Sequence, residues 1–268
     1  MVKDMKKNIL FIILAILIFT CSCEKESSPS KKLPPSEEGV TYSLRSPDNE
    51  EVDNGYWEDY DTVEEAVEYL EEMRQYGYVV YDSNGKLVYY PFDTLAQSKL
   101  LYYAKLVADY VAFNGYSYGN ASKNPAFDRG KTEKLVSCDR YVGWVLHDMG
   151  FVEGQPDSAG LGLYGSKNLE NFLKENGFTK ITDKKELKPG DIIFVGDSAE
   201  HYPNLQGAWL DYPDHVFIYA CPSTFNDQFY RYDAGSSRRI QSDQPSCEPL
   251  EYSPEKLFRF AYRLPSDY

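Results

Sequence analysis

The pattern of apolar and polar residues along the chain predicts mainly helices before residue 187 and strands after it. In "DTVEEAVEYLEEMRQYGY" apolar residues recur at helical spacing, and either Asp61 or Thr62 is placed to cap the helix. The segment "TLAQSKLLYYAKLVADYVAFNG" predicts a long amphipathic helix that ends at Gly115. Two further helices are expected, one opened by Ser137 and one in "GSKNLENFLKENGF" with Ser166 as its cap.

Strand signals dominate after residue 187. The segments "LKPGDIIFV", "DHVFIYAC", "QFYRYDAG" and "EKLFRFAYRL" are rich in β-branched and aromatic residues. Nearer the N-terminus, "YVVYDSNGKLVYY" predicts a hairpin with Asn84 and Gly85 in its turn. Helices followed by strands with hairpin-length connections indicate an α+β fold on an antiparallel sheet.

The first residues have the character of a targeting segment. Several lysines precede an apolar run of about 15 residues, which is short for a membrane span. A short apolar run that ends at cysteine resembles a bacterial lipoprotein signal, which would cover residues 1–22 and place the lipid on Cys21 or Cys23. A plain signal peptide or an uncleaved anchor is the alternative. We therefore expect an extracytoplasmic protein, held by lipid at the bacterial cell surface or in the periplasm.

The rest of the chain divides into three regions by composition. Residues 23–55 carry mainly Ser, Pro, Lys, Glu and Asp, which predicts a flexible tether. Residues 56–92 hold the acidic helix and the hairpin and are expected to form a small unit without recognisable chemistry. Residues 93–268 are expected to form the main domain.

Charge and cysteine content narrow the possible partners. The formal net charge of -14 disfavours nucleic acid, and it disfavours an anionic membrane bound through a basic patch. Beyond the signal three cysteines remain, so at least one thiol has no internal partner. The sequence leaves open a disulfide between Cys221 and Cys247. Cysteines and histidines are too few and too scattered to predict a zinc site, and no other metal or cofactor is implied.

Cys138 is the first candidate for chemistry. It shares the buried stripe of its helix with Val142 and Val145, which favours a small core residue. It also lies in the first turn after Ser137, where the helix N-terminus favours a thiolate, and the thiolate is the nucleophilic form. The nucleophile interpretation requires a base, and a group that orients the base.

His215 is the histidine best placed to be that base. His147 lies about two and a half turns from Cys138 on the same helix, and His201 lies in a polar loop. His215 opens the apolar strand "HVFIYA", and Asp233 follows on the next strand. If these strands pair as a hairpin, the two residues lie opposite each other, or diagonally after a slip of two residues. A histidine satisfied by a backbone carbonyl, and an aspartate in ordinary turn chemistry, are the alternatives.

The run "SCDRYVGWVL", then "LKPGDIIFV", then "HVFIYA" resembles the NlpC/P60 family of cysteine peptidases in both type and order. The similarity covers roughly residues 95 to 265. It implies a papain-like core, in which the cysteine-bearing helix packs on an antiparallel sheet. It also implies Cys138 as nucleophile, His215 as base and Asp233 as the third polar residue, where many members have His, Asn or Gln.

The same resemblance implies the substrate and the groups around it. The tyrosine hydroxyl that helps at the oxyanion maps to Tyr118 in "GYSYGN", with Tyr116 as second candidate. Many members read Asp-Cys-Ser-Gly, whereas this chain reads Ser-Cys-Asp-Arg, so Asp139 is a displaced candidate for substrate binding. Trp209 lies in a long insertion that is either a wall of the cleft or a surface loop. The implied activity is hydrolysis of peptidoglycan stem peptides.

Two alternatives stay open at this point. The same chemistry can act on an amide or acyl substrate outside the cell wall. A non-catalytic surface lipoprotein that only binds a ligand also agrees with an acidic, tyrosine-rich chain.

Overall fold

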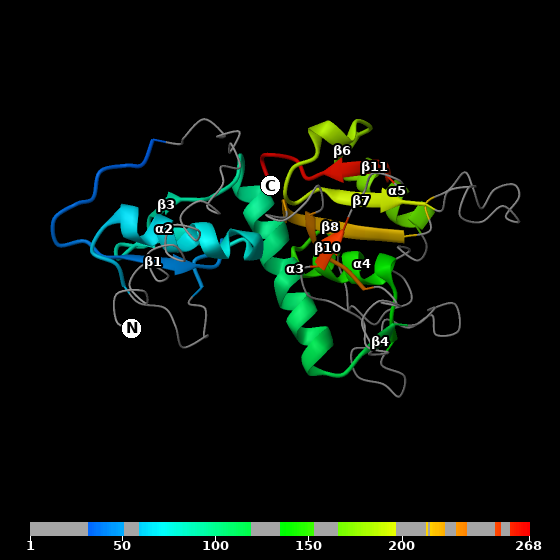
Figure 1. Ribbon diagram of the computed structural model, residues 1–268, viewed down its shortest axis with the longest axis horizontal. Coiled ribbons are helices and arrows are strands. Elements are labelled where there is room, and N and C mark those ends of the chain that lie inside the picture. Colours follow the sequence, from blue (N-terminus) through cyan, green and yellow to red (C-terminus); the bar gives the residue numbers. More distant parts are fainter. Residues whose placement is uncertain are drawn as a thin grey trace, which may run out of the picture. The chain divides into compact units, whose positions relative to one another are not determined.

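The fold of the described part of the chain is seen in a computed structural model (Figure 1). Residues Pro34–Tyr268 form one compact unit. The expected signal segment, with Cys21 and Cys23, lies outside the described residues. The described residues are 32–50, 59–118, 135–152, 166–196, 213, 215–222, 229–234, 250–252 and 258–268.

A three-stranded antiparallel sheet forms the N-terminal part of this unit, in the order β1-β2-β3. The predicted hairpin is confirmed, and Gly85 takes a left-handed φ of 79° in its turn. Helix α2 begins after Thr62, whose side chain accepts a hydrogen bond from Glu65 N, so Thr62 and not Asp61 is the cap. The elements are β1 (Tyr42–Arg45), α2 (Val63–Met73), η1 (Arg74–Tyr76), β2 (Val79–Asp82) and β3 (Leu87–Tyr89).

Strand β1 corrects the prediction that all of residues 23–55 form a tether. Tyr42 and Leu44 are 3% and 2% exposed, and β1 pairs antiparallel with β2 over its whole length. The tether was predicted from the low apolar content of residues 23–55. Tyr42 and Leu44 alone do not raise that content enough to predict a strand. The strand forms because β2, distant in sequence, offers it an edge and an apolar surface.

Helix α3 (Leu95–Phe113) contacts η1 and also α4, β8 and β9. It starts with a reciprocal cap, in which Thr94 accepts from Gln97 N while the Gln97 side chain accepts from Thr94 N. A Cβ at Gly77 would lie 2.1 Å from Ser98 O. Only glycine therefore allows the chain after η1 to approach the helix this closely.

Three helices end in the same way, with a glycine followed by an aromatic residue. Gly115, Gly150 and Gly177 all have positive φ. The next residue donates its N–H to the carbonyl five positions back, as in Tyr116 N to Val111 O. This arrangement turns the aromatic side chain back onto its own helix. The helices concerned are α3, α4 (Cys138–Asp148) and α5 (Ser166–Glu175), and Ser166, expected as the cap of α5, is already helical.

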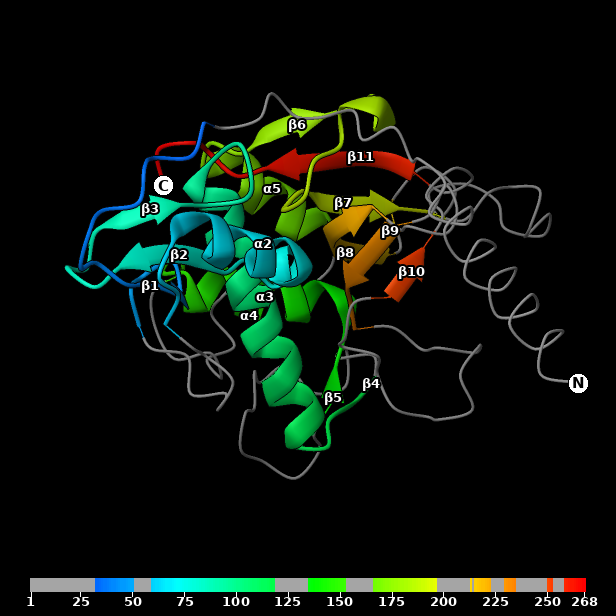
Figure 2. The ribbon, with the colours of Figure 1, turned by 60° about the vertical axis from the view of Figure 1, so that its left-hand side comes forward.

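The main layer is a six-stranded antiparallel sheet, in the order β10-β9-β8-β7-β11-β6 (Figure 2). The four strands predicted after residue 187 are confirmed, while β6 and β10 were not predicted. The fold is therefore α+β. The strands are β6 (Thr179–Ile181), β7 (Ile192–Val195), β8 (His215–Pro222), β9 (Phe229–Tyr232), β10 (Leu250–Tyr252) and β11 (Phe258–Arg263), with the short helix η4 (Lys184–Glu186) before β7.

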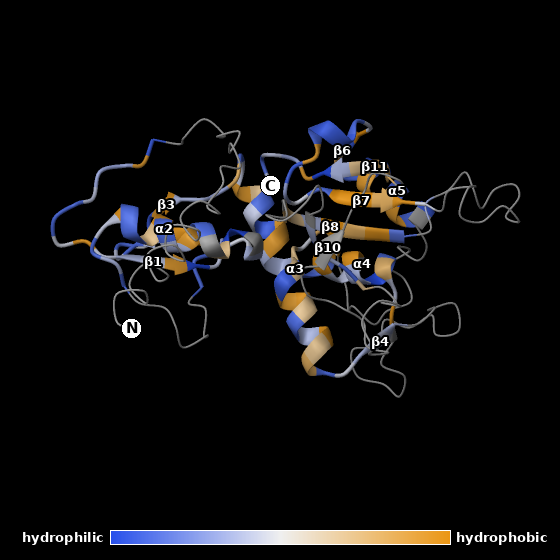
Figure 3. Ribbon diagram, viewed as in Figure 1, coloured by the Kyte–Doolittle hydropathy of each residue, from blue (hydrophilic) through white to orange (hydrophobic). Residues whose placement is uncertain are grey.

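Strands β7 and β8 are apolar on both faces, which Figure 3 shows as orange ribbon. Val216 and Ile218 lie in the core shared with α3, α4 and α5, whereas Phe217 and Tyr219 lie in a second cluster with other sheet residues. Burial on both faces explains why these strands read as continuous apolar runs in the sequence. Helix α4 is held against α3 by Tyr141, whose hydroxyl donates to Ala104 O at 2.6 Å.

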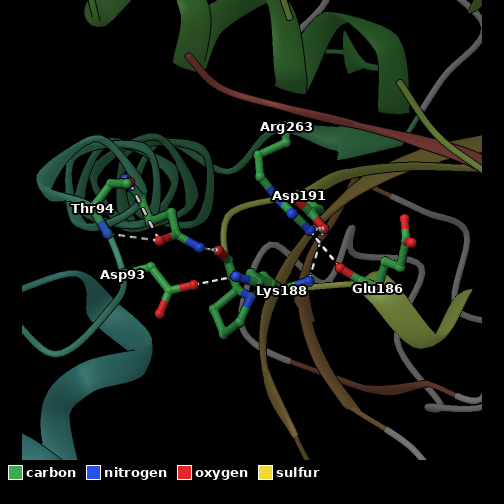
Figure 4. Close-up of polar contacts among 8 residues, drawn as sticks. Asp93, Thr94, Glu186, Lys188, Asp191 and Arg263 are labelled. Atoms are coloured by element: carbon green, nitrogen blue, oxygen red, sulfur yellow. Dashed lines mark hydrogen bonds and ion pairs between the residues drawn. The ribbon is translucent and has the colours of Figure 1, made fainter. Parts of the chain in front are cut away.

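The Pro-Gly-Asp turn at the start of β7 joins three elements, and Figure 4 shows part of this cluster. Gly190 has a φ of 88°, and the Gln97 side chain donates to Pro189 O at 2.9 Å. Asp191 receives Arg263 Nε at 2.9 Å and Arg263 Nη2 at 2.8 Å. The backbone N–H of Lys188 donates to the same carboxylate at 2.7 Å. The turn motif thus ties α3, β7 and β11 together.

Candidate active site

Cys138 is the first residue of α4, as the sequence predicts, and it is 5% exposed. Ser137 occupies the N-cap with an extended backbone, but its side chain accepts no N–H from the first turn. The Ser137 hydroxyl instead donates to Asp139 Oδ1 at 2.5 Å. The sulfur therefore lies at a helix start where no serine side chain caps the backbone N–H groups.

His215 and Asp233 are brought together by the pairing of β8 with β9. Ile218 pairs with Tyr232 and Tyr219 with Arg231, which shifts the register by two residues from direct opposition of His215 and Asp233. A shift of two keeps both side chains on one face as diagonal neighbours. His215 Nε2 lies 3.0 Å from Asp233 Oδ1. The predicted contact between the histidine and the aspartate is confirmed.

His215 also forms a hydrogen bond with the side chain of Cys138. Since Nε2 faces Asp233, the other ring nitrogen is the one left for the sulfur. Burial alone would lower the pKa of His215, but the charges of Asp233 and Cys138 and hydrogen bonds to both raise it to about 10. The imidazole is therefore protonated at neutral pH.

Asp233 is fully buried, and its second oxygen has a partner that sequence reasoning missed. Arg231 Nη2 lies 3.0 Å from Asp233 Oδ2. Burial alone would raise the pKa of Asp233, but the charges of His215 and Arg231 and the hydrogen bond with His215 hold it below its ordinary value. The available signal was the spacing in "RYD", since residues two apart on a strand share a face.

Tyr118 and Tyr116 have different environments. Strand β4 (Ser117–Tyr118) pairs in parallel with β5 (Leu135–Val136), and Tyr118 lies opposite Val136, two residues before Cys138. Tyr118 is 36% exposed, whereas Tyr116 is 1% exposed and packs edge-on against Trp144. The glycine-ended turn after α3 directs the Tyr116 ring into the core, which favours Tyr118 over Tyr116 as the tyrosine that reaches a substrate.

Asp139 is 6% exposed and receives the Ser137 hydroxyl. This hydrogen bond joins the N-cap to the first turn of α4, beside Cys138. The expected role of Asp139 in substrate binding stays a prediction. The adjacent Arg140 is equally buried, at 6% exposure.

Other candidates lie elsewhere or outside the described residues. Trp209 and His201 are outside them, and so is Cys247, so the disulfide with Cys221 stays a prediction. His147 Nδ1 lies 3.0 Å from Asp148 Oδ1 at the end of α4.

Two properties were tested over the described residues alone. They contain no group of three or more His, Cys, Asp or Glu side chains arranged to hold a metal ion. Within the same residues, no helix combines the length and apolar character needed to cross a membrane.

The site thus contains a thiol, an imidazole and a carboxylate in series. These are the groups that nucleophilic acyl transfer uses, with a base beside the nucleophile and a third group that orients the base. No family model, no curated protein and no solved structure matches this chain.

Proposed function

We propose that this protein is a cysteine amide hydrolase at the bacterial cell surface, and that its α+β fold contains a papain-like core of the NlpC/P60 type. The observation that carries the proposal is that His215 Nε2 lies 3.0 Å from Asp233 Oδ1 while the same ring also interacts with the side chain of Cys138. The contact of α4, which starts with Cys138, with strand β8, which starts with His215, further supports a papain-like arrangement.

The reaction follows from the protonation states of these groups. The Cys138 thiolate attacks the carbonyl carbon of an amide, and the carbonyl electrons move to the oxygen. A backbone N–H at the start of α4 and the Tyr118 hydroxyl stabilise this oxyanion. When the tetrahedral intermediate collapses, the C–N bond breaks and the His215 imidazolium gives its proton to the leaving amine.

Hydrolysis of the acyl-enzyme returns the site to its starting state. The neutral imidazole of His215 takes a proton from water, and the resulting hydroxide attacks the thioester carbonyl. Collapse releases the carboxylic acid and the Cys138 thiolate, while His215 keeps the proton. Asp233 holds the ring orientation and stabilises the imidazolium throughout.

Peptidoglycan stem peptides are the substrate class that the resemblance favours. A lipid anchor at residue 21 or 23 would hold the enzyme beside the cell wall, which agrees with this substrate. The recognition groups of the family are displaced here, since Asp139 follows the nucleophile and its carboxylate is buried. An amide or acyl substrate outside the cell wall is therefore part of the same proposal.

One observation favours the non-catalytic alternative. Cys138 is only 5% exposed, and a buried thiol acts as an ordinary core residue when no substrate reaches it. In that case the domain would bind a ligand or partner at the cell surface without cleaving it.

Alkylation and digestion experiments decide between these functions. The full chain is treated with iodoacetamide at about pH 5.5, where an unactivated thiol reacts slowly, and modification of each cysteine is measured by peptide mass mapping. We expect rapid modification of Cys138, strong loss of that modification in His215→Ala, and release of peptide fragments from purified muropeptides that Cys138→Ala abolishes.

Cys221 provides the matched control. It is also a buried cysteine, near the far end of β8 from His215, and burial raises its pKa to about 11. Cys221→Ser should retain full activity, and Cys221 itself should stay unmodified at the same pH. An inert Cys138 in the wild-type chain would favour the binding function instead.

A further inference from the structure

Arg231 is a charged residue beside Asp233 that the proposed reaction does not use. It comes from β9, two residues before Asp233, and its side chain is 16% exposed. Its Nη2 lies 3.0 Å from Asp233 Oδ2, on the opposite oxygen from His215. The guanidinium carbon also lies 5.2 Å from the centre of the Phe217 ring, and that ring lies 6.1 Å from the ring of His215.

Phe217 thus forms a common wall for the base and for the arginine. A cation over an aromatic face is attracted by the ring electrons, and the flat guanidinium has few alternative positions there. The two cations contact different oxygens of a carboxylate that is completely buried. Because each oxygen lies 3.0 Å from a cationic nitrogen, the charge of the carboxylate is balanced from both sides.

Charge balance gives Arg231 a second effect. Asp233 and Arg231 together are neutral, so the charge of a protonated His215 is left to balance the Cys138 thiolate. Without Arg231, the proton on His215 would be needed to neutralise the buried carboxylate, and a thiolate beside it would be an uncompensated buried charge. The charged groups that act on this cluster are Cys138 from α4, His215 from β8, and Asp233 and Arg231 from the β9 segment.

We propose that Arg231 is a positioning residue of the site: it holds and neutralises Asp233, so that the charge of His215 stabilises the Cys138 thiolate. This inference rests on the proposed hydrolase function and adds a fourth residue to the series. Arg231 does not touch the reacting atoms, and it acts only through Asp233.

The test compares variants that separate charge from hydrogen bonding. Arg231→Gln keeps an N–H donor but removes the charge, whereas Arg231→Lys keeps the charge without the planar fork. The measurement is the rate of iodoacetamide modification of Cys138 between about pH 5 and 9, with folding checked by thermal melting. We expect Arg231→Gln to react about tenfold more slowly below pH 6 and Arg231→Lys to stay within about threefold of wild type.

Two further variants test whether Arg231 acts through Asp233. In an Asp233→Asn background, adding Arg231→Gln should cause no additional loss, because the group that Arg231 holds is already neutral. Arg259→Gln is the matched control, since Arg259 is an exposed arginine on β11, two strands away from β8. Its reaction profile should equal that of wild type.

The outcomes distinguish this inference from the proposed function. A wild-type Cys138 that is inert below pH 6 overturns the hydrolase function itself. A reactive wild type with an unchanged Arg231→Gln profile overturns only the positioning role, and so does a loss of the same size in the Asp233→Asn background. If Arg231→Gln alone does not fold, Arg231→Lys and the double variant, which has no unpaired buried charge, still give the comparison.

Discussion

Two fully buried aspartates in the same sheet form ion pairs with arginine, and the two pairs are built differently. Asp191 receives two nitrogens of Arg263 and a backbone N–H of Lys188, so every donor to it is a group that keeps its proton at physiological pH. Asp233 receives a single nitrogen of Arg231 on one oxygen and His215 on the other.

This difference separates a structural pair from a chemical one. The pair between Asp191 and Arg263 attaches the turn that precedes β7 to strand β11. The same Arg263 also donates to Glu186 O at 2.5 Å. The Asp233 pair includes one partner that can gain and lose a proton and that also contacts a thiol. A buried ion pair becomes part of a reactive site when one of its members is histidine.

The largest effect should come from neutralising Asp233. Although many members of the NlpC/P60 family have Asn at this place, we expect Asp233→Asn to reduce amide hydrolysis by about 10²–10⁴-fold, because the amide would leave the charges of His215 and Arg231 unbalanced. Asp191→Asn should leave the turnover per folded molecule within about threefold of wild type, because that carboxylate touches no reacting group. Both are measured as release of peptides from muropeptides. Equal losses of activity in the two variants would contradict the distinction between the Asp191 and Asp233 ion pairs.

Loss of the Asp191 carboxylate should instead appear in the stability of the fold. Asp191→Asn should lower the free energy of unfolding by about 3 kcal/mol, near the low end for breaking a buried pair, because Arg263 is still 24% exposed. Urea denaturation followed by circular dichroism gives this value, with Arg259→Gln as a surface control. A change below about 1 kcal/mol would mean that the turn does not depend on the pair.

The pH dependence sharpens the comparison further. The pKa of His215 is raised to about 10, so its stabilising contribution is complete below about pH 6.5 and is lost as pH rises to 10. The pKa of Asp233 is lowered, so its contribution is present above about pH 4 and is lost in stronger acid. Wild type should therefore lose more stability between about pH 6.5 and 10 than Asp233→Asn does.

The same ionisation can be followed directly. A histidine NMR titration should place His215 near pH 10 in wild type and at least about one unit lower in Asp233→Asn. An unchanged His215 midpoint would mean that Asp233 does not supply the charge.

The smallest effect is expected in the turn that presents Asp191. Gly190 has a φ of 88°, and a Cβ there would lie 3.3 Å from Gln97 Cα. Gly39 has a φ of 78° with nothing within 4 Å of such a Cβ. Gly39→Ala should cost about 1 kcal/mol from backbone strain alone, and Gly190→Ala about 1 kcal/mol more from the contact. If urea denaturation gives equal losses of unfolding free energy for the two variants, the contact with Gln97 has no measurable cost.

Much of the architecture was accessible from the sequence because its causes are local. Apolar periodicity located α2, α3, α4 and α5, and the Asn-Gly turn located the first hairpin. The strands β6 and β10 are only three residues long, and β1 lies in a polar context, so their apolar signal was too weak to detect. Such strands form only where a neighbouring strand offers an edge.

The candidate site shows the same division at the level of single residues. The pairing of His215 with Asp233 followed from a hairpin whose strands lie close in sequence. Arg231 was missed because its role depends on which partner shares its face of the sheet. The burial of Tyr116 was not foreseen because it depends on a turn that directs its ring against Trp144.

The sequence by itself determined the order of the elements, the place of Cys138 at the start of a helix, and the strand pair that carries a histidine and an aspartate. The tertiary structure alone decided that the sulfur, the ring and the carboxylate meet, that Arg231 completes the charge, and that Asp139 turns inward. The physical reason is that periodicity and turn chemistry act over a few neighbouring residues. Burial and charge pairing depend instead on groups that folding brings together from distant parts of the chain.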